Sequence, residues 1–244
     1  MVDNPVLFYG VWIAIAFTIT SFLIAMVILM ERLKSEQATK ALKSTIEEQE
    51  RMMKAISEEV HDNFNQMLNL AVMSIHMIPE TKDNLEYKTN SIQILKTLIA
   101  DAQYISRSLN SELLKRTGLK QSLNQIALWV NLSKKIECTV TITGKKTESD
   151  PETELMAVRI TQEAINNAIK YARAKNLGIT LHYGEQNMQL TILDDGLGFD
   201  FHSGDFKEGV GIQSMRQRAS VIQGTLEIIS KKGFGTTIKL TVPK

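Results

Sequence analysis

The sequence predicts three architectures in succession: one transmembrane helix, an all-α dimerisation hairpin, and an α/β two-layer sandwich. An uncharged apolar stretch comes first, and a polar stretch with helical periodicity follows it. After Leu119, helical and strand patterns alternate, which favours a layered α/β domain. A chain of 244 residues is long enough to hold such a domain beside a helical element.

Charge and composition exclude several classes of protein. The chain has 28 basic and 27 acidic side chains, so no strong field attracts nucleic acid, and we expect no direct nucleic-acid binding. An apolar fraction of 43% excludes wholesale disorder. Cys138 is the one cysteine, which excludes a disulfide framework and a cysteine zinc site. An unpaired thiol agrees with a reducing compartment.

The uncharged stretch from Leu7 to Met30 predicts an uncleaved membrane anchor. A helix that crosses the bilayer needs about 20 apolar residues, and a soluble helix is rarely apolar on every face. A cleaved signal peptide is the alternative, but only Asp3 is charged before the stretch, and no positive region precedes it. Basic residues follow the stretch at Arg32, Lys34, Lys40 and Lys43. Because positive segments stay inside, we expect one lipid-facing helix in the inner (cytoplasmic) membrane, with the N-terminus outside and the rest cytoplasmic.

The next stretch predicts a long amphipathic helix that belongs to a hairpin. Seam positions recur at spacings of four and three, at Leu42, Ile46, Gln49, Met53, Ile56 and Val60. After a one-residue phase shift the apolar face continues at Phe64, Leu68, Ala71, Ile75 and Ile78. Pro79 ends this pattern, and a second helix is expected from Leu85 to Lys115. Each face is narrow, so we expect a homodimer in which two hairpins form a four-helix bundle.

The remaining chain predicts the α/β sandwich. Helices are expected over 119–132, 151–172 and 212–223, and strands over 137–143, 178–183, 188–193, 225–230 and 236–242. Asp150 is a candidate N-cap for the second of these helices, with Pro151 in its first turn.

One of these helices carries a polar stripe that could bind a metal ion. Glu163, Asn167 and Lys170 lie on one helical face. A carboxylate, an amide oxygen and an ammonium suit a hydrated Mg²⁺ ion beside phosphates, since Mg²⁺ prefers oxygen ligands and keeps waters. A solvated face with an acid–base pair is the alternative for these three residues alone.

A strand end followed by glycines could bind a nucleotide base. Asp194 ends an apolar strand, and Gly196 and Gly198 follow it. Two glycines let a ligand approach the backbone, and a carboxylate can accept a hydrogen bond from a base amine. A hairpin turn has the same short pattern and stays open as an alternative.

Two further glycine clusters follow. Gly209 and Gly211 open a helix without side chains that would block its N-terminal amides, which suits a phosphate. Gly233 and Gly235 precede Thr236 at the start of the last strand. The order and spacing of the clusters carry more information than any one of them.

Four ordered motifs, EAINNAIKYA, DDGLGFD, EGVGIQSMRQRA and GFGTT, resemble the ATP-binding domain shared by sensor histidine kinases, DNA gyrase, the ninety-kilodalton heat-shock chaperones and the MutL mismatch-repair proteins. The resemblance implies ATP and Mg²⁺ as cofactors, a mixed sheet with helices on one face, and a mobile lid over about 199–208. It implies Asn167 as metal ligand, Glu163 organising the metal's water, Lys170 facing the phosphates, Asp194 binding the adenine amine, Gly196 and Gly198 shaping the base pocket, Gly209 and Gly211 bordering the phosphates, and Thr236 near the base.

The upstream stretch ISEEVHDNFNQMLNL resembles the phospho-acceptor box of sensor histidine kinases in which Asp follows the acceptor His. This resemblance implies His61 as the acceptor, Asp62 as the residue that orients its ring and draws off its proton, and Gln66 as a residue that dephosphorylates the partner. A neutral imidazole nitrogen is a competent acceptor near neutral pH. For Gln66, a solvated surface residue chosen for helix propensity is the alternative.

The resemblance implies a domain division and a function. The expected division is a stub and transmembrane helix over 1–30 (span 7–30), a signalling coiled-coil helix over 31–56, a dimerisation and histidine phosphotransfer hairpin over 57–117, and an ATP-binding catalytic domain over 118–244. The implied protein is a membrane-anchored sensor histidine kinase that phosphorylates His61 and passes the group to an aspartate of a response regulator receiver domain, which it also dephosphorylates. A membrane-tethered ATP-gated dimeric scaffold and a simple gyrase-like ATPase are the alternatives. Because the stub is short, we expect the signal to arrive through the span or from a membrane sensor partner.

Overall fold

The computed structural model describes residues 5–81, 84–132, 134, 136–145, 150–200 and 208–244. The chain divides into two compact units, residues 1–45 and 46–244, which we treat separately. Helix α1 (Pro5–Glu59) begins in the first unit and ends in the second.

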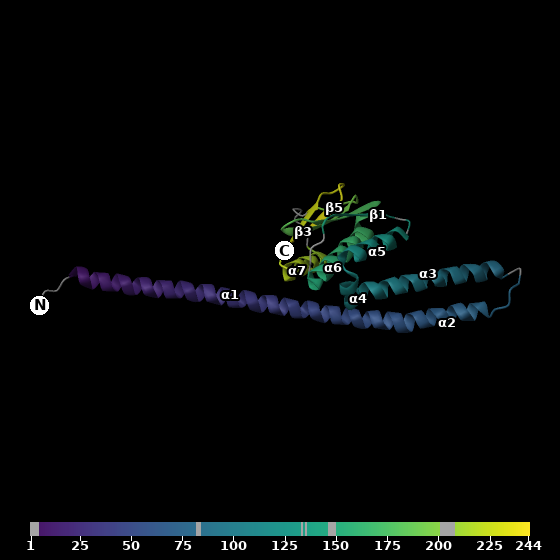
Figure 1. Ribbon diagram of the computed structural model, residues 1–244, viewed down its shortest axis with the longest axis horizontal. Helices are drawn as coiled ribbons and strands as arrows, with labels where there is room; N and C mark the ends of the chain where they lie inside the picture. Colours follow the sequence, from purple (N-terminus) through teal and green to yellow (C-terminus); the bar gives the residue numbers. More distant parts are fainter. Residues whose placement is uncertain (1–4, 82–83, 133, 135, 146–149, 201–207) are drawn as a thin grey trace. The chain divides into compact units, whose positions relative to one another are not determined.

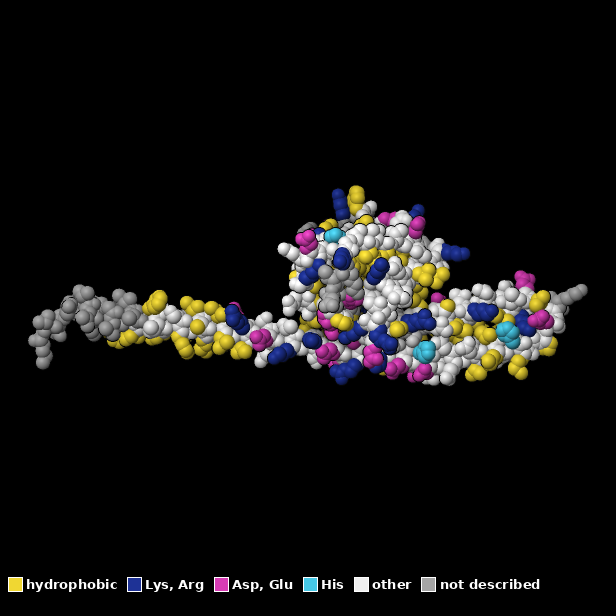
Figure 2. Space-filling view, viewed as in Figure 1, with side chains coloured by type: hydrophobic (Ala, Val, Ile, Leu, Met, Phe, Trp, Pro, Cys, Tyr) yellow, Lys and Arg dark blue, Asp and Glu magenta, His cyan; other side chains and the backbone are white. Residues whose placement is uncertain are grey.

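The first unit consists of the N-terminal part of α1. Its large apolar side chains from Ile15 to Met30 are exposed, and Figure 2 shows them as a hydrophobic surface on the helix. Among the described residues, one helix is long and apolar enough to cross a membrane, by length and composition. The stretch predicted to span the membrane, 7–30, lies within this helix.

In the second unit a helical hairpin continues α1. A π-helical turn, η1 (Val60–Phe64), leads into α2 (Asn65–His76), and α3 (Leu85–Leu109) returns antiparallel beside α2 (Figure 1). A π-helical turn accommodates one extra residue in a helix, and such turns are frequent at functional sites. This turn is the structural form of the one-residue phase shift that the sequence predicts after Val60.

Small polar residues beside the predicted seam line the inner face of the hairpin within one chain. Ser57 and Asn65 are buried, whereas Ile56 and Phe64 are 53% and 59% exposed. The Ser57 hydroxyl donates to the Ser106 carbonyl oxygen at 2.7 Å, and the Ser106 hydroxyl donates to the Ser57 carbonyl oxygen at 3.0 Å. Small polar side chains that satisfy each other allow the two helices to approach closely, so the larger apolar neighbours face outward.

The predicted second helix, Leu85 to Lys115, is interrupted in the structure. Helix α3 ends at Leu109, and α4 spans Ser111–Thr117. Between them Asn110 has a ψ angle of 102°, and its side-chain oxygen accepts a hydrogen bond from the Leu113 N–H at 2.9 Å. An asparagine that caps a new helix competes with continuation of the old one, which explains why two helices replace the single predicted helix.

The α/β domain has helices on one face of a five-stranded mixed sheet (Figure 1). The helical elements are α5 (Leu119–Leu132), α6 (Pro151–Asn167), the π-helical turn η2 (Ala168–Ala172) and α7 (Val210–Val221). The strands are β1 (Glu137–Gly144), β2 (Asn176–Tyr183), β3 (Asn187–Asp194), β4 (Thr225–Ser230) and β5 (Thr236–Pro243), in the order β1-β2-β3-β5-β4. Strands β1 and β2 pair in parallel, and the other neighbours are antiparallel.

A hydrophobic core between helices and sheet positions these elements. Leu123 on α5, Ile160 on α6, Leu181 on β2 and Leu240 on β5 are fully buried. Each such side chain contributes about 1.5–3 kcal/mol when it leaves water. Asp150 caps α6 as predicted, because its carboxylate accepts a hydrogen bond from the Thr153 N–H at 3.3 Å. The start of the helix that carries the polar stripe is therefore fixed.

Candidate functional site

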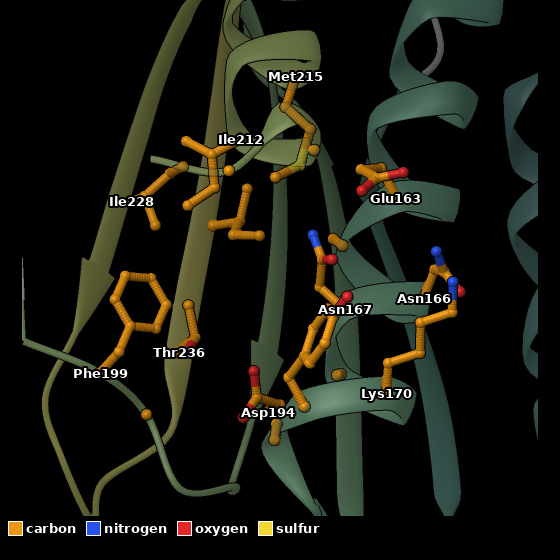
Figure 3. A pocket seen from close by; sticks show the side chains of 18 of the residues that line it. Glu163, Asn166, Asn167, Lys170, Asp194, Phe199, Ile212, Met215, Ile228 and Thr236 are labelled. Atoms are coloured by element: carbon orange, nitrogen blue, oxygen red, sulfur yellow. The ribbon is translucent and has the colours of Figure 1, made fainter. Parts of the chain in front are cut away.

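A cavity of about 600 Å³ lies between α6, α7 and the sheet (Figure 3). Most of the residues that the sequence singles out line it, namely Glu163, Asn167, Lys170, Asp194, Gly198, Gly209, Gly211 and Thr236. They come from four separate segments of the chain. The fold thus brings the polar stripe, glycines of the first two clusters and Thr236 around one space.

The helical wall is polar. Glu163 and Asn167 lie one turn apart on α6, and Lys170 lies in the π-helical turn η2 that continues it. Figure 3 shows Asn167 directed into the space between helix and sheet, with Lys170 beside Asn166. Asn167 is half-buried and Lys170 is exposed, so the wall changes from enclosed to solvated along the helix.

Asp194 forms the buried end of the cavity. It ends β3, it is only 7% exposed, and its Oδ1 atom accepts a hydrogen bond from the Gly196 N–H at 2.9 Å. Burial raises the pKa of Asp194 above the usual aspartate range, although hydrogen bonds from Gly196 and Thr236 oppose the shift. The result is a fixed, partly desolvated hydrogen-bond acceptor.

The neighbouring Asp195 has a different position and a structural task. It is exposed, and its Oδ1 atom accepts hydrogen bonds from the backbone N–H groups of Lys175 at 2.7 Å and Asn176 at 2.9 Å. Its Oδ2 atom accepts a bond from the Asn176 side chain at 2.7 Å, and these bonds lower the pKa of Asp195. Asp195 therefore holds the start of β2, and only Asp194 lines the cavity.

Close approach explains the glycine at 198 and shows what a side chain at 211 would disturb. Gly198 has a φ angle of +57°, and a Cβ atom there would collide with the Lys231 carbonyl oxygen. A Cβ atom on Gly211 would collide with the carboxylate of Glu163. Gly196 does not line the cavity; it supplies an N–H to Asp194 and packs against Ala172.

The N-terminus of α7 opens onto the cavity. The helix starts at Val210, and its N-cap residue Gly209 has no side chain to occupy the free amides. A Cβ atom on Gly209 would meet open space, so packing does not require glycine there. Unpaired N–H groups and the helix dipole favour an anion at this end.

Sequence reasoning missed the apolar wall of the cavity. Phe199, Ile212, Met215, Ile228 and Ile238 line it opposite the polar helix. The alternation of apolar residues in the last two strands was the available signal, because the paired positions 228 and 238 share one sheet face. An apolar wall beside a buried acceptor suits a flat heteroaromatic ring. Most of the lid expected over 199–208 lies outside the described residues.

The oxygen donors of α6 fit Mg²⁺ better than a softer metal. Among the described residues, no group of three or more His, Cys, Asp or Glu side chains could hold a metal ion. Mg²⁺ is usually held by one or two protein oxygens together with waters and substrate phosphates. The amide oxygen of Asn167 and the carboxylate of Glu163, which line the cavity together, match that requirement.

The other three predicted residues lie away from this cavity. His61 and Asp62 are in the π-helical turn η1 and Gln66 is in the first turn of α2, and all three are exposed. None of them lines the cavity. The structure thus places the nucleotide-type cavity and the histidine on different elements of the second unit.

Comparisons with known proteins agree with this arrangement. Residues 152–244 match the family described as histidine kinase-, DNA gyrase B-, and HSP90-like ATPase. The oxygen sensor histidine kinase NreB of Staphylococcus carnosus is 29% identical over 207 residues, which are 84% of this chain and 60% of that protein. Sensor protein VraS of Staphylococcus epidermidis is 31% identical over 193 residues, 77% of this chain and 54% of that protein. The chain spans somewhat more than half the length of these curated relatives.

Among solved structures, the histidine kinase domain from the Erythrobacter litoralis EL346 blue-light activated histidine kinase is similar at 15% identity and a TM-score of 0.47. The match covers 74% of this chain and 94% of that one. Motifs and cavity thus agree with the comparisons: residues 152–244 match the histidine kinase-, DNA gyrase B- and HSP90-like ATPase family, and the chain is similar in sequence to sensor histidine kinases.

Proposed function

We propose that the protein is a membrane-anchored sensor histidine kinase that uses Mg·ATP to phosphorylate His61 and then passes the phosphoryl group to an aspartate of a response regulator. The proposal depends on the combination of an ATP-binding type of cavity and an exposed histidine within one chain. An ATPase-family domain with a polar and apolar cavity follows a hairpin with an exposed histidine in a π-helical turn.

In this proposal the cavity binds ATP in one orientation. The Asp194 carboxylate accepts a hydrogen bond from the adenine amine, while Phe199, Ile228 and Ile238 cover the base. The amides at the start of α7 face the phosphates, and Lys170 adds a positive charge beside them. Positioning and charge neutralisation supply most of the catalysis in phosphoryl transfer.

Mg²⁺ fits the polar wall that α6 forms. Asn167 would hold Mg²⁺ directly, and Glu163 would orient one of its waters. When bound, Mg²⁺ neutralises charge on the phosphates as the transfer proceeds. The close packing of Gly211 against the Glu163 carboxylate keeps that side chain in place.

The transfer itself needs a nucleophile from the hairpin. A neutral ring nitrogen of His61 forms the new bond to the γ-phosphorus, while the bond from phosphorus to the β–γ bridging oxygen breaks and ADP leaves. Asp62 orients the ring and accepts its proton. The phosphoryl group then passes from nitrogen to the carboxylate of the regulator, and Gln66 positions a water that later hydrolyses it.

Assembly and location follow from the exposed apolar faces. The outer face of the hairpin carries exposed apolar side chains at Phe64, Met67, Leu70, Met73, Ile94 and Leu98. A second copy that covers this face would complete a four-helix bundle. The apolar part of α1 would cross the cytoplasmic membrane once, with the basic residues that follow it inside.

The experiment uses the full chain in lipid discs with γ-labelled ATP and Mg²⁺. A kinase forms a protein-bound label that is stable to base and labile to acid. A simple ATPase releases phosphate steadily without such a label, and an ATP-gated scaffold does neither. Asn167→Ala should abolish the label, whereas Asn124→Ala, an exposed asparagine on α5 outside the cavity, should retain it. No label on the parent chain would refute the proposal.

A further inference from the structure

A second cavity, of about 340 Å³, is lined mainly by helices α3, α4 and α5 in the second unit. Among the described residues it shares none of its lining with the cavity that Figure 3 shows, so the two are separate. Small-molecule sites usually have volumes of about 300–1,000 Å³, so this cavity is large enough for a compact organic molecule. Neither the four sequence motifs nor the phospho-acceptor box contributes to it.

The lining of this second cavity is mainly apolar. Leu114 on α4 and Ile126 on α5 are buried in it. Leu113, Leu128 and Leu132 also line it, but their side chains are exposed. Exposed leucine side chains leave water when an apolar molecule binds beside them, and that burial favours binding. The lining therefore favours a ligand with an apolar body.

An aromatic pair forms part of the same lining. Tyr104 on α3 stacks on Trp129 on α5, with ring centroids 4.4 Å apart and planes 4° from parallel. Burial raises the pKa of Tyr104 to about 12, so the phenol keeps its proton at neutral pH. A flat ring in the cavity can pack against this pair in the offset or edge-to-face arrangements that aromatic rings prefer.

One buried polar group in the lining points to a ligand. Ser122 on α5 is 1% exposed, and its hydroxyl has no hydrogen-bond partner among the residues that the structure describes. Buried hydroxyl groups without a partner are unfavourable and rare in native structures. Because Ser122 lines the cavity, a polar atom of a bound molecule can supply the missing partner.

Arg107 on α3 supplies the positive charge of the lining. It is exposed, and its guanidinium forms no ion pair within the described part of the chain. The one carboxylate of the lining, Asp101, lies six residues earlier on α3, about 9 Å along the helix axis. Asp101 is also exposed, so water screens its charge. A free guanidinium can bind a carboxylate through two parallel hydrogen bonds.

We propose that this cavity binds a small aromatic carboxylic acid that carries a hydroxyl group on its ring. The Arg107 guanidinium binds the carboxylate. The leucines and the aromatic pair cover the ring, and the ring hydroxyl forms a hydrogen bond with Ser122. The proposal does not rest on the proposed kinase function, because no residue of the nucleotide-type cavity takes part in it.

The test uses para-hydroxycinnamate as the probe and the full chain in lipid discs. In a Trp12→Phe background Trp129 is the only tryptophan, so fluorotryptophan labelling places a single fluorine signal at the cavity. The chemical shift of that signal should follow a saturable titration with a Kd of about 0.1–1 mM, as expected for about a dozen non-hydrogen atoms. Saturating ATP should leave this Kd unchanged, because the two cavities share no lining residue.

Two variants assign the polar contacts, each with a matched probe. Arg107→Gln removes the charge, so it should weaken binding of para-hydroxycinnamate at least tenfold and leave binding of the neutral para-hydroxycinnamamide unchanged. Ser122→Ala should weaken binding of para-hydroxycinnamate about three- to tenfold. The same variant should leave binding of cinnamate, which lacks the hydroxyl, unchanged.

Arg116→Gln is the matched control, because Arg116 is an exposed arginine on α4 that does not line the cavity. Its Kd for para-hydroxycinnamate should equal the parent value. The absence of a saturable shift of the Trp129 signal in the parent chain would overturn the proposal. An effect of Arg107→Gln that is equal for the acid and the amide, or an unchanged Kd in Ser122→Ala, would overturn it as well.

Discussion

Replacing Asp194 with asparagine tests how the cavity recognises a nucleotide. The carboxylate has two oxygens, and the Gly196 N–H already occupies Oδ1 at 2.9 Å. Asparagine has one acceptor oxygen. If that oxygen stays with Gly196, the NH₂ group faces the adenine amine, and two donors oppose each other in a site that is 7% exposed.

The expected size of the effect follows from that geometry. A buried polar group left without a partner costs about 1–3 kcal/mol, which weakens binding roughly 5- to 150-fold. Titration of the full chain with a fluorescent ATP analogue measures the Kd directly. Asp195→Asn is the matched control, because Asp195 binds the backbone of Lys175 and Asn176 and lies outside the cavity. Its Kd should stay within about twofold of the parent value, while its Tm should fall.

The pH dependence gives a second readout of the same residue. Burial raises the pKa of Asp194, so the acceptor carboxylate is lost at a higher pH than for an ordinary aspartate. Nucleotide affinity of the parent should therefore fall as the pH drops through that raised pKa, and the affinity of Asp194→Asn should not. The raised pKa also means that the charged form opposes folding at neutral pH, so Asp194→Asn should not lower the Tm. Equal Kd values for Asp194→Asn and the parent would refute this reasoning.

Three other substitutions test separate parts of the molecule. Gly211→Ala should push the Glu163 carboxylate aside and slow Mg²⁺-dependent turnover at least tenfold; an unchanged turnover rate would contradict this role of Glu163. Leu123→Ala should cost about 2–5 kcal/mol in denaturant unfolding because Leu123 is fully buried, whereas Leu128→Ala, 64% exposed on the same helix, should cost little. Gln66→Ala should keep autophosphorylation but lose phosphatase activity toward the phosphorylated regulator, and an unchanged dephosphorylation rate would leave Gln66 as a surface residue.

The helices and strands of the α/β domain could be predicted because local signals and burial agree there. The cap at Asp150, the alternation in the strands and the glycine before α7 each mark an element boundary within about two residues. The hairpin was harder to predict. The residues from Leu85 to Lys115 favour a helix throughout, so only the side-chain cap at Asn110 breaks it.

The packing of side chains inside the hairpin could not be predicted from the sequence pattern either. The pattern marks Ile56 and Phe64 as apolar seam residues, but it does not show that Ser57 and Asn65 pack inside the hairpin of one chain. The two π-helical turns have no sequence signature beyond the phase shift after Val60. The buried positions and the π-helical turns both depend on contacts with neighbouring helices, and periodicity within one helix contains no information about those contacts.

In the candidate site, the polar and glycine residues were predictable because their types suit phosphate, metal and base. The apolar wall was not, since Met215 and Ile228 resemble ordinary core residues. Arg107 and Ser122 of the second cavity were missed for a related reason. They lie on different helices, and the meeting of two helices at one cavity leaves no local pattern.

The position of the phosphoryl group tests the central claim most directly. The full chain is incubated with γ-labelled Mg·ATP, and the parent, His61→Gln and His76→Gln are compared for acid-labile, base-stable label. His76 is the matched control, because it is an exposed histidine at the end of α2 in the same hairpin. The account predicts that the parent and His76→Gln carry the label and that His61→Gln does not. Undiminished label in His61→Gln would contradict it.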